Sequence, residues 1–351
     1  MSPSFLTSSN LPALPPQPEG VDWPTQEWPT AEASREVDRR TLDGVSARLF
    51  APSARERTGE THGLVVIHRG RLVAERYAVE FNSEHLFPSW SMAKSFTHAL
   101  VGILAGRGKL AVEQRAAVPD WQAPDDARGA IRLDDLLRMV DGLEFNEDYV
   151  DEHVSHVIEM LFGEGKQDVT AYAVARDLAH PPGSIWNYSS GSSNIVSGIL
   201  GRTIGGGEAG MRAFLEEELL HRIGIRGADP RFDAAGNFIA SSFLFATARD
   251  FARFGLLYLR DGRWDGERLL PEGWVDYARS VTPGSEGQYG AHWWLATDSS
   301  GIFHASGYRG QYIVVDPSRD LVVVRVGSSD PEQRRAVYLA LKEIDRAFPL
   351  L

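Results

Sequence analysis

The sequence predicts an α/β protein in which an antiparallel sheet is flanked by helices and an all-helical domain is inserted. Strand-like runs lie at both ends of the chain, and the stretch between about residues 110 and 223 is helical and loop-rich with almost no strand pattern. Strands from both ends around a helical middle imply one sheet with helices packed on it. We therefore expect an α/β domain from residues 36–109 and 240–351, and a helical domain from residues 110–239.

The N-terminal elements are an arm and a hairpin. Residues 1–35 are rich in Pro, Ser, Thr and Glu, which indicates an extended arm pinned by Trp23 and Trp28 or, equally, a structureless tail. Order is expected to begin at Gly63, where GLVVIHRGRLVAERYAV joins two β-rich runs through Arg69-Gly70, a hairpin signal.

The later elements are helices and a last group of strands. Apolar residues at helical spacing predict a helix over residues 91–109. Five helical patterns follow: DDLLRMVDGL, HVIEMLFGEG, TAYAVARDLA, SNIVSGILGRTIGG and GMRAFLEEELLHRIG. Two amphipathic helices are predicted at ATARDFARFGLLYLRDGRW and EQRRAVYLALKEIDRAF. Between them lie four short strand candidates: GAHWWLAT, GIFHASG, QYIVVD and DLVVVRVG, the last two joined by a turn at residues 316–320.

The composition excludes several classes of function. The 351 residues carry 36 Lys and Arg against 48 Asp and Glu, a net charge of −12, which argues against a nucleic-acid partner because phosphate binding needs a basic surface. No apolar run approaches the roughly 18 residues of a membrane span. The absence of cysteine excludes disulfides and thiol nucleophiles. The first residues lack the basic and apolar regions of a signal peptide, so we expect a cytoplasmic protein.

The sharpest local feature is the sequence PSWSMAK at residues 88–94. Ser91 stands at the predicted helix start and Lys94 follows three residues later, so both side chains fall on one helix face. A serine needs a base to become a nucleophile, and a lysine can be that base when burial lowers its pKa. S-x-x-K also occurs by chance, and the alternative is that Ser91 caps the helix while Lys94 is solvated.

Two further features support this chemistry. Tyr188 lies in the Gly/Ser-rich stretch PPGSIWNYSSGSSN (181–194), where its hydroxyl could relay a proton. The sequence HASGY at residues 304–308 lies on a predicted strand, and Gly307 would let a substrate approach the strand edge closely. His304 could equally be a core or edge-strand histidine.

Together these residues resemble the serine β-lactamase and D-alanyl-D-alanine peptidase superfamily, and most closely its class-C-like branch of esterases and 6-aminohexanoate-dimer hydrolases. The resemblance covers roughly residues 60–350. Besides S-x-x-K and PPG-x-x-W-x-Y-S-S-G, it includes DDLLRMVDGLEF (134–145), the segment 241–274, YGAHWW (289–294) and GYRGQYIVVDP (307–317). It implies a β-lactamase/transpeptidase-like fold with the site at the seam of its two domains.

The resemblance also implies roles for individual residues. Ser91 would be the acylated nucleophile, Lys94 its general base and Tyr188 the second proton-transfer group. The backbone N–H groups of Ser91 and Tyr308 would form the oxyanion hole. The implied function is a serine hydrolase that cleaves small esters or amides without a metal or cofactor. The residues expected to contact substrate are His304, Ala305, Ser306, Gly307, Ser190 and Tyr149.

Two positions depart from the superfamily pattern. Ser190 stands where β-lactamases and peptidases carry Asn, and Ala305 begins the strand motif where they carry Lys or His. A strand lysine there is the usual partner of a substrate carboxylate. Because Ala305 offers no charge, we expect neutral esters to be preferred over cephalosporins and D-alanyl peptides. Arg309 is the substitute that could supply the missing cation.

Alternatives remain at the level of sequence. Asp151, Glu152, His153 and His156 could mimic a metal cluster, but no third ligand of recognisable spacing accompanies the histidines, and flanking the cleft is the favoured interpretation. Neither G-x-S-x-G nor a P-loop is found, which counts against an α/β-hydrolase and a nucleotide enzyme. The competing functions are a class C β-lactamase or D-amino-acid peptidase, and a catalytically silent binding protein on the same fold.

Overall fold

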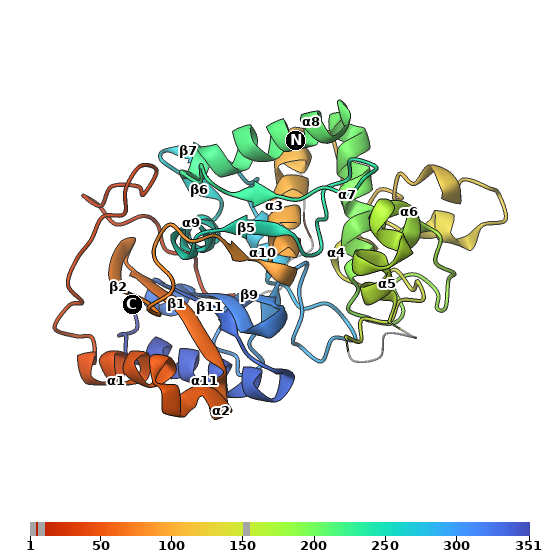
Figure 1. The fold of residues 1–351 in the computed structure, drawn as a ribbon. Coiled ribbons are helices and arrows are strands. Elements are labelled where there is room, and N and C mark those ends of the chain that lie inside the picture. Colours follow the sequence, from red (N-terminus) through yellow and green to blue (C-terminus); the bar gives the residue numbers. More distant parts are fainter. Residues whose placement is uncertain (1–4, 6–10, 150–154) are drawn as a thin grey trace.

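A six-stranded antiparallel sheet forms the centre of the computed structural model, which describes residues 5, 11–149 and 155–351 (Figure 1). The strand order is β2-β1-β11-β10-β9-β8. The bounds are Glu60–His68 (β1), Arg71–Tyr77 (β2), Trp294–Leu295 (β8), Phe303–Gly307 (β9), Gln311–Asp316 (β10) and Leu321–Ser328 (β11). Because β1 pairs with β11, the predicted sheet built from both ends of the chain is confirmed.

Tight turns connect the central strands. Arg69 and Gly70 have φ values of 50° and 74°, and positive φ at both residues is what a two-residue hairpin turn between β1 and β2 needs. A short turn at Pro317–Arg319 joins β10 to β11, whose register pairs Ile313 with Val324. All residues of β10 are buried, as expected for a strand covered on both faces.

Helices cover both faces of the sheet (Figure 1). One face carries α1 (Arg39–Phe50) and α11 (Pro331–Arg346), and the other carries α3 (Ala93–Gly106) and α9 (Ala248–Leu259). Gly255 lets α9 lie close to the sheet, because a Cβ at this position would meet Val322 at 2.7 Å. The sheet is therefore the middle layer of three.

The helical insert and the short elements complete the chain. Between β3 and β5 lie α4 (Leu133–Leu137), α5 (His156–Phe162), α6 (Val169–Val174), α7 (Ser190–Ile204) and α8 (Gly207–Leu215). A small sheet of order β3-β5-β4 joins Phe87–Pro88 (β3), Leu244–Ala246 (β5) and Asp229–Pro230 (β4). The others are α2 (Arg55–Thr58), α10 (Trp274–Ala278), β6 (Arg263–Trp264) and β7 (Glu267–Arg268).

The expectation that order begins at Gly63 is wrong. The helix α1 precedes that residue, and Asp38 caps it by accepting a hydrogen bond from the N–H of Thr41 at 3.1 Å. Leu42 and Val45 of this helix are buried in the core shared with α11. The sequence signal was Leu42, Val45 and Leu49, three apolar residues at spacings of three and four with polar or small residues between them.

The described part of the N-terminal arm runs along the body of the protein. Trp28 is 7% exposed, and the ring of Trp23 lies 5.1 Å from that of Trp264. The buried side chain of Arg253 donates to the carbonyl of Pro24 at 2.8 Å. Indole packing and backbone hydrogen bonds therefore both hold this segment.

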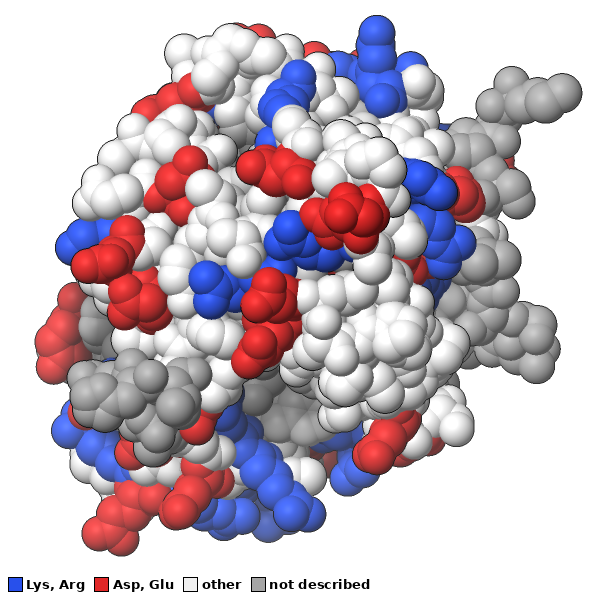
Figure 2. All heavy atoms as spheres, turned by 90° about the vertical axis from the view of Figure 1, so that its right-hand side faces the viewer, with Lys and Arg blue, Asp and Glu red and all other residues white. Residues whose placement is uncertain are grey.

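The surface carries charges of both signs. On the face shown in Figure 2, Lys and Arg side chains are interspersed with Asp and Glu side chains. Among the described helices, none is long and apolar enough to cross a membrane.

Candidate active site

Ser91 lies in a one-turn 3-10 helix (Trp90–Met92) that leads directly into α3. Trp90 has φ 46°, a left-handed conformation that is uncommon for a residue with a Cβ. Such strained residues persist when the surroundings fix them, and they concentrate at functional sites. The sharp turn leaves Ser91 partly exposed, whereas Met92 and the helix that follows are buried.

Lys94 lies directly beneath the serine. Its Nζ is 3.1 Å from Ser91 Oγ, 2.9 Å from Ser190 Oγ and 3.0 Å from the carbonyl oxygen of Ser241. The lysine is 1% exposed, and this burial lowers its pKa to about 8, against the opposing effect of the Glu147 carboxylate. A neutral lysine within hydrogen-bond distance of a hydroxyl can accept its proton.

Tyr188 completes the group predicted from the sequence. It lies just before α7, whose N-terminus is capped by Ser189. The Tyr188 ring is 5.0 Å from Lys94 Nζ, and the hydroxyl interacts with Ser91. Burial raises the pKa of Tyr188 well above its ordinary value, so the phenol is protonated at neutral pH. The structure therefore brings together all three side chains to which the sequence assigned chemistry.

A carboxylate extends this group in a way that the sequence did not predict. Glu147 accepts hydrogen bonds from the backbone N–H of Ser190 at 2.8 Å and from its hydroxyl at 2.6 Å. Because Ser190 Oγ also contacts Lys94, a continuous chain of hydrogen bonds runs from Ser91 to Glu147. Tyr149 of the same loop is expected from the sequence to contact substrate, but the position of Glu147 in the sequence gives no sign of a link to the lysine.

The strand β9 ends beside the serine at Gly307. A Cβ at this position would lie 2.3 Å from the carbonyl oxygen of Ser89, two residues before Ser91. Glycine is needed here for close packing of β9 against the backbone that carries the serine, in addition to the substrate approach expected from the sequence. The contact brings Tyr308, the first residue after β9, next to the cavity.

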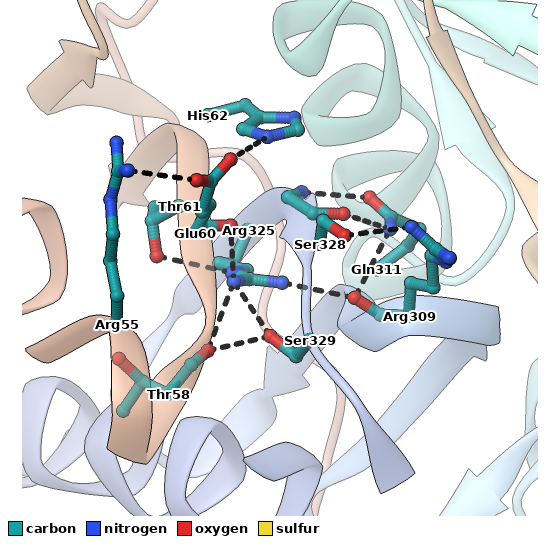
Figure 3. Close-up of polar contacts among 11 residues, drawn as sticks. Arg55, Thr58, Glu60, Thr61, His62, Arg309, Gln311, Arg325, Ser328 and Ser329 are labelled. Atoms are coloured by element: carbon teal, nitrogen blue, oxygen red, sulfur yellow. Dashed lines mark hydrogen bonds and ion pairs between the residues drawn. The ribbon is translucent and has the colours of Figure 1, made fainter.

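Buried polar side chains hold the turn Tyr308–Gly310 (Figure 3). The Gln311 amide nitrogen donates to the carbonyls of Gly327 and Tyr308 at 2.6 and 3.2 Å, and its oxygen accepts from the Gly327 N–H at 3.0 Å. Arg325 is fully buried and donates to the Gly310 carbonyl at 2.8 Å and to the Glu60 carbonyl at 2.8 Å. Burial lowers the pKa of Arg325 to about 10, so it remains charged at neutral pH.

A cavity of about 420 Å³ opens over Ser91. Its lining also includes Glu147, Asp148, Tyr149, Tyr188, Trp294, Ser306, Gly307, Tyr308, Pro331 and Arg334. Tyr149 stacks on Tyr308, with ring centroids 4.7 Å apart. Of the two adjacent tryptophans, Trp294 reaches the cavity and Trp293 is buried in the core, as side-chain alternation along a strand requires.

Two residues expected to contact substrate lie elsewhere. Ala305 is 1% exposed and belongs to the apolar core on the α3 and α9 side of the sheet. His304 packs against Tyr312 and Tyr338, with ring centroids 6.0 and 5.0 Å away, and burial lowers its pKa to about 3. Because side chains alternate along a strand, Ala305 lies on the opposite face of β9 from Ser306. His304 is on the same face as Ser306 but two residues farther from the end of the strand at Gly307.

The basic residues near the site divide between two cavities. Arg309, the substitute anchor considered from the sequence, lines a neighbouring cavity of about 580 Å³ and donates to Ser328 Oγ at 3.0 Å. That cavity shares Tyr149 and Tyr308 with the first. Arg334 of α11 lines the cavity over Ser91. The sequence predicts an amphipathic helix at this position and gives no sign that Arg334 lines a cavity.

The alternative metal cluster falls largely outside the described residues. Asp151, Glu152 and His153 are not described. The fourth member, His156, accepts a hydrogen bond at Nδ1 from the N–H of Asn146 at 2.9 Å. Among the residues that the structure describes, no group of three or more His, Cys, Asp or Glu could hold a metal ion.

Comparison with known proteins gives one consistent result. The family model described as Beta-lactamase matches residues 47–347. A 6-aminohexanoate-dimer hydrolase from Paenarthrobacter ureafaciens is 27% identical over 323 residues, which cover 84% of this chain and 79% of the relative. Among solved structures, a candidate 6-aminohexanoate-dimer hydrolase from Bacillus anthracis has a TM-score of 0.74 at 24% identity, covering 98% of this chain and 90% of that one. EstCE1, a hydrolase with promiscuous acyltransferase activity, has a TM-score of 0.68 at 16% identity, covering 88% and 97%.

Proposed function

The chain belongs to the beta-lactamase family and is a serine hydrolase, and we propose that it cleaves ester or amide bonds of small substrates through an acyl-enzyme on Ser91. The observation that carries the proposal is the buried Lys94, with a lowered pKa, 3.1 Å from the serine hydroxyl. The family assignment confirms the resemblance seen in the sequence. The assignment of individual residues remains our proposal.

The proposed reaction has two half-reactions. Neutral Lys94 takes the proton of Ser91 as Oγ bonds to the substrate carbonyl carbon, and N–H groups of Ser91 and Tyr308 stabilise the oxyanion. The bond to the leaving alcohol or amine then breaks, and Tyr188 relays a proton to that group. In the second half-reaction water attacks the acyl carbon and gives a proton to Lys94, the bond between that carbon and Ser91 Oγ breaks, and the proton passes to Oγ as the acid is released.

The substrate class is proposed from the same cavity. Tyr149, Ser306 and Gly307 line it and are the proposed contacts, whereas Ser190 acts behind it through Lys94. The name of the Paenarthrobacter relative makes a linear 6-aminohexanoate amide the first amide to test. β-Lactams remain the alternative substrates: the strand lacks the lysine that normally meets their carboxylate, so another cation of the cavity would have to bind it. We also keep the cytoplasm as the proposed compartment, in keeping with the cysteine-free sequence.

Covalent labelling tests the proposal directly. A fluorescent serine-directed phosphonate should label the wild-type protein, and digestion followed by mass spectrometry should find the label on the peptide containing Ser91. Ser91→Ala should abolish labelling and reduce kcat for p-nitrophenyl esters by at least about 10⁴-fold while the thermal unfolding midpoint stays nearly unchanged. Ser184→Ala removes an exposed hydroxyl from the stretch containing Tyr188 and serves as the control.

The possible failures are informative. Ester hydrolysis retained by a folded Ser91→Ala protein would place the nucleophile elsewhere. A wild-type protein that is neither labelled nor active on short esters, 6-aminohexanoate amides or a chromogenic cephalosporin would instead favour the silent binding protein.

A further inference from the structure

Arg334 is the described cation that lines the cavity over Ser91. It stands in the first turns of α11, which begins directly after β11 and contacts the turn Tyr308–Gly310. Pro331, at the first position of the same helix, also lines the cavity. The connection between β11 and α11 therefore brings the N-terminal end of this 16-residue helix to the proposed oxyanion side of the serine.

The guanidinium of Arg334 has no partner within the described part of the chain. No hydrogen bond or ion pair joins its side chain to a described residue, although carboxylates line the same cavity. One of these, Glu147, is engaged with both the N–H and the hydroxyl of Ser190. The side chain is half-buried, so its charge is held at the cavity with incomplete hydration.

The charge of Arg334 reaches the reacting groups. It favours the ionised form of Tyr188 and so opposes the increase that burial causes in the pKa of this phenol. An arginine cannot serve as a base near neutral pH, but its planar fork of N–H groups matches a carboxylate. An unpaired guanidinium that lines the same cavity as the nucleophile is thus suited to bind an anionic part of the substrate.

We propose that Arg334 anchors a carboxylate carried by the substrate, so that the enzyme acts on esters or amides of acidic compounds. The inference rests on the proposed function and names the substrate class of that site. It replaces the expectation that neutral substrates are preferred. That expectation was based on two positions only, namely Ala305, which carries no charge, and Arg309, which could have supplied the cation instead. The structure places Ala305 in the core and Arg309 beside the neighbouring cavity.

Two matched substrate pairs test the anchor. Phenyl butyrate and 3-carboxyphenyl butyrate differ by a carboxylate on the leaving group, and p-nitrophenyl valerate and mono-p-nitrophenyl glutarate differ by one on the acyl group. In at least one pair, Arg334→Gln should lower kcat/KM for the carboxylate member by about tenfold to a hundredfold relative to the neutral member. The pair that responds identifies the side of the scissile bond that faces Arg334.

The next residue provides the control. Arg335 is exposed, stands on the same helix and does not line the cavity, so Arg335→Gln removes an equal charge without removing the anchor. We expect it to leave both ratios unchanged. Raising the salt concentration should weaken the carboxylate preference of the wild-type protein only partly, because the site is half-buried.

The outcomes separate the anchor from the proposed function. Equal effects of Arg334→Gln on both members of both pairs, with Ser91-dependent turnover intact, would overturn the anchor and leave the hydrolase standing. If the wild-type protein shows no Ser91-dependent turnover of any ester, the proposed function itself is overturned.

Discussion

The two walls of the cavity over Ser91 satisfy their polar groups in different ways. On the first, which we call the proton-transfer wall, Glu147 lines the cavity and accepts a hydrogen bond from Ser190, whose hydroxyl contacts the 1% exposed Lys94 behind the lining. The second, the strand wall, consists of Ser306, Gly307, Tyr308 and Arg334. Its cation is half-buried and has no described partner.

This difference indicates that the proton-transfer wall supplies the base for the reaction, whereas Arg334 of the strand wall binds the substrate. Burial lowers the pKa of the Lys94 ammonium to about 8, so a neutral base is available near neutral pH. An arginine cannot serve as a base near neutral pH, so the role left to Arg334 is binding. Changes to the proton-transfer wall should therefore affect neutral and carboxylate substrates alike, whereas Arg334 should affect only substrates that carry a carboxylate.

Among changes to the two walls, the largest effect is expected for Lys94→Arg. Guanidinium cannot accept the Ser91 proton near neutral pH, so kcat should fall by at least about a thousandfold for neutral and acidic esters alike. Thermal unfolding and circular dichroism must show that the buried arginine is accommodated. Near-normal kcat in a folded variant would remove the lysine from the mechanism.

The wild-type pH profile gives a second measure of the same lysine. Because only the neutral form is a base, activity should be lost on the acid side as Lys94 gains its proton, with kcat/KM falling tenfold per pH unit below an apparent pKa near 8. The Tyr188 ring centroid lies 5.0 Å from Lys94 Nζ, and where two titratable groups interact, the apparent value belongs to the pair.

The strand wall can be weakened without touching the lysine. Gln311→Leu removes the amide that holds the Tyr308 carbonyl and both backbone groups of Gly327. A displaced Tyr308 N–H would stabilise the oxyanion less well, and we expect kcat to fall by about tenfold to a hundredfold with little change in KM. The loss should be equal for both members of each matched ester pair.

The structural cost of that variant must be measured separately. Buried backbone groups left without a partner destabilise the protein by about 1–3 kcal/mol each, so urea unfolding should show a lower midpoint. Assays well below the unfolding transition then isolate the effect on kcat. A loss confined to carboxylate substrates would contradict the assignment of the turn to oxyanion binding.

The two walls also differ in what the sequence could predict. The strands β10 and β11 could be predicted from their β-branched runs and the turn signal between them, because these features depend only on residues that are neighbours in the sequence. The group of Ser91, Lys94 and Tyr188 followed from ordered motifs and the family resemblance. Arg334 could not be chosen from the sequence, because it and Arg335 are adjacent arginines in one amphipathic pattern. Only the placement of α11 against the turn after β9 distinguishes them.

The expectation that His304 and Ala305 of β9 contact substrate does not fit the structure, and the reason is again that packing between distant elements decides the outcome. A strand motif shows that residues 304–307 alternate, but it does not show which face meets the cavity. Packing of β9 against Ser89 and α9 sends Ala305 inward and leaves Ser306 and Gly307 at the cavity. The role of Glu147 could not be predicted from the sequence either, because its contact with Ser190 joins residues 43 positions apart.

The smallest effect is expected for Glu147→Gln, which tests how the proton-transfer wall tunes its base. The carboxylate favours the protonated form of Lys94, so removing its charge should lower the pKa of the lysine and move the acid limb of kcat/KM to lower pH. Glutamine keeps an acceptor for Ser190, so the change at any one pH should be on the order of a few-fold. Asp148→Asn removes the same charge from the next residue without the bond to Ser190 and should move the limb less. An acid limb that stays in place, or moves to higher pH, would show that Glu147 does not act on Lys94 through its charge.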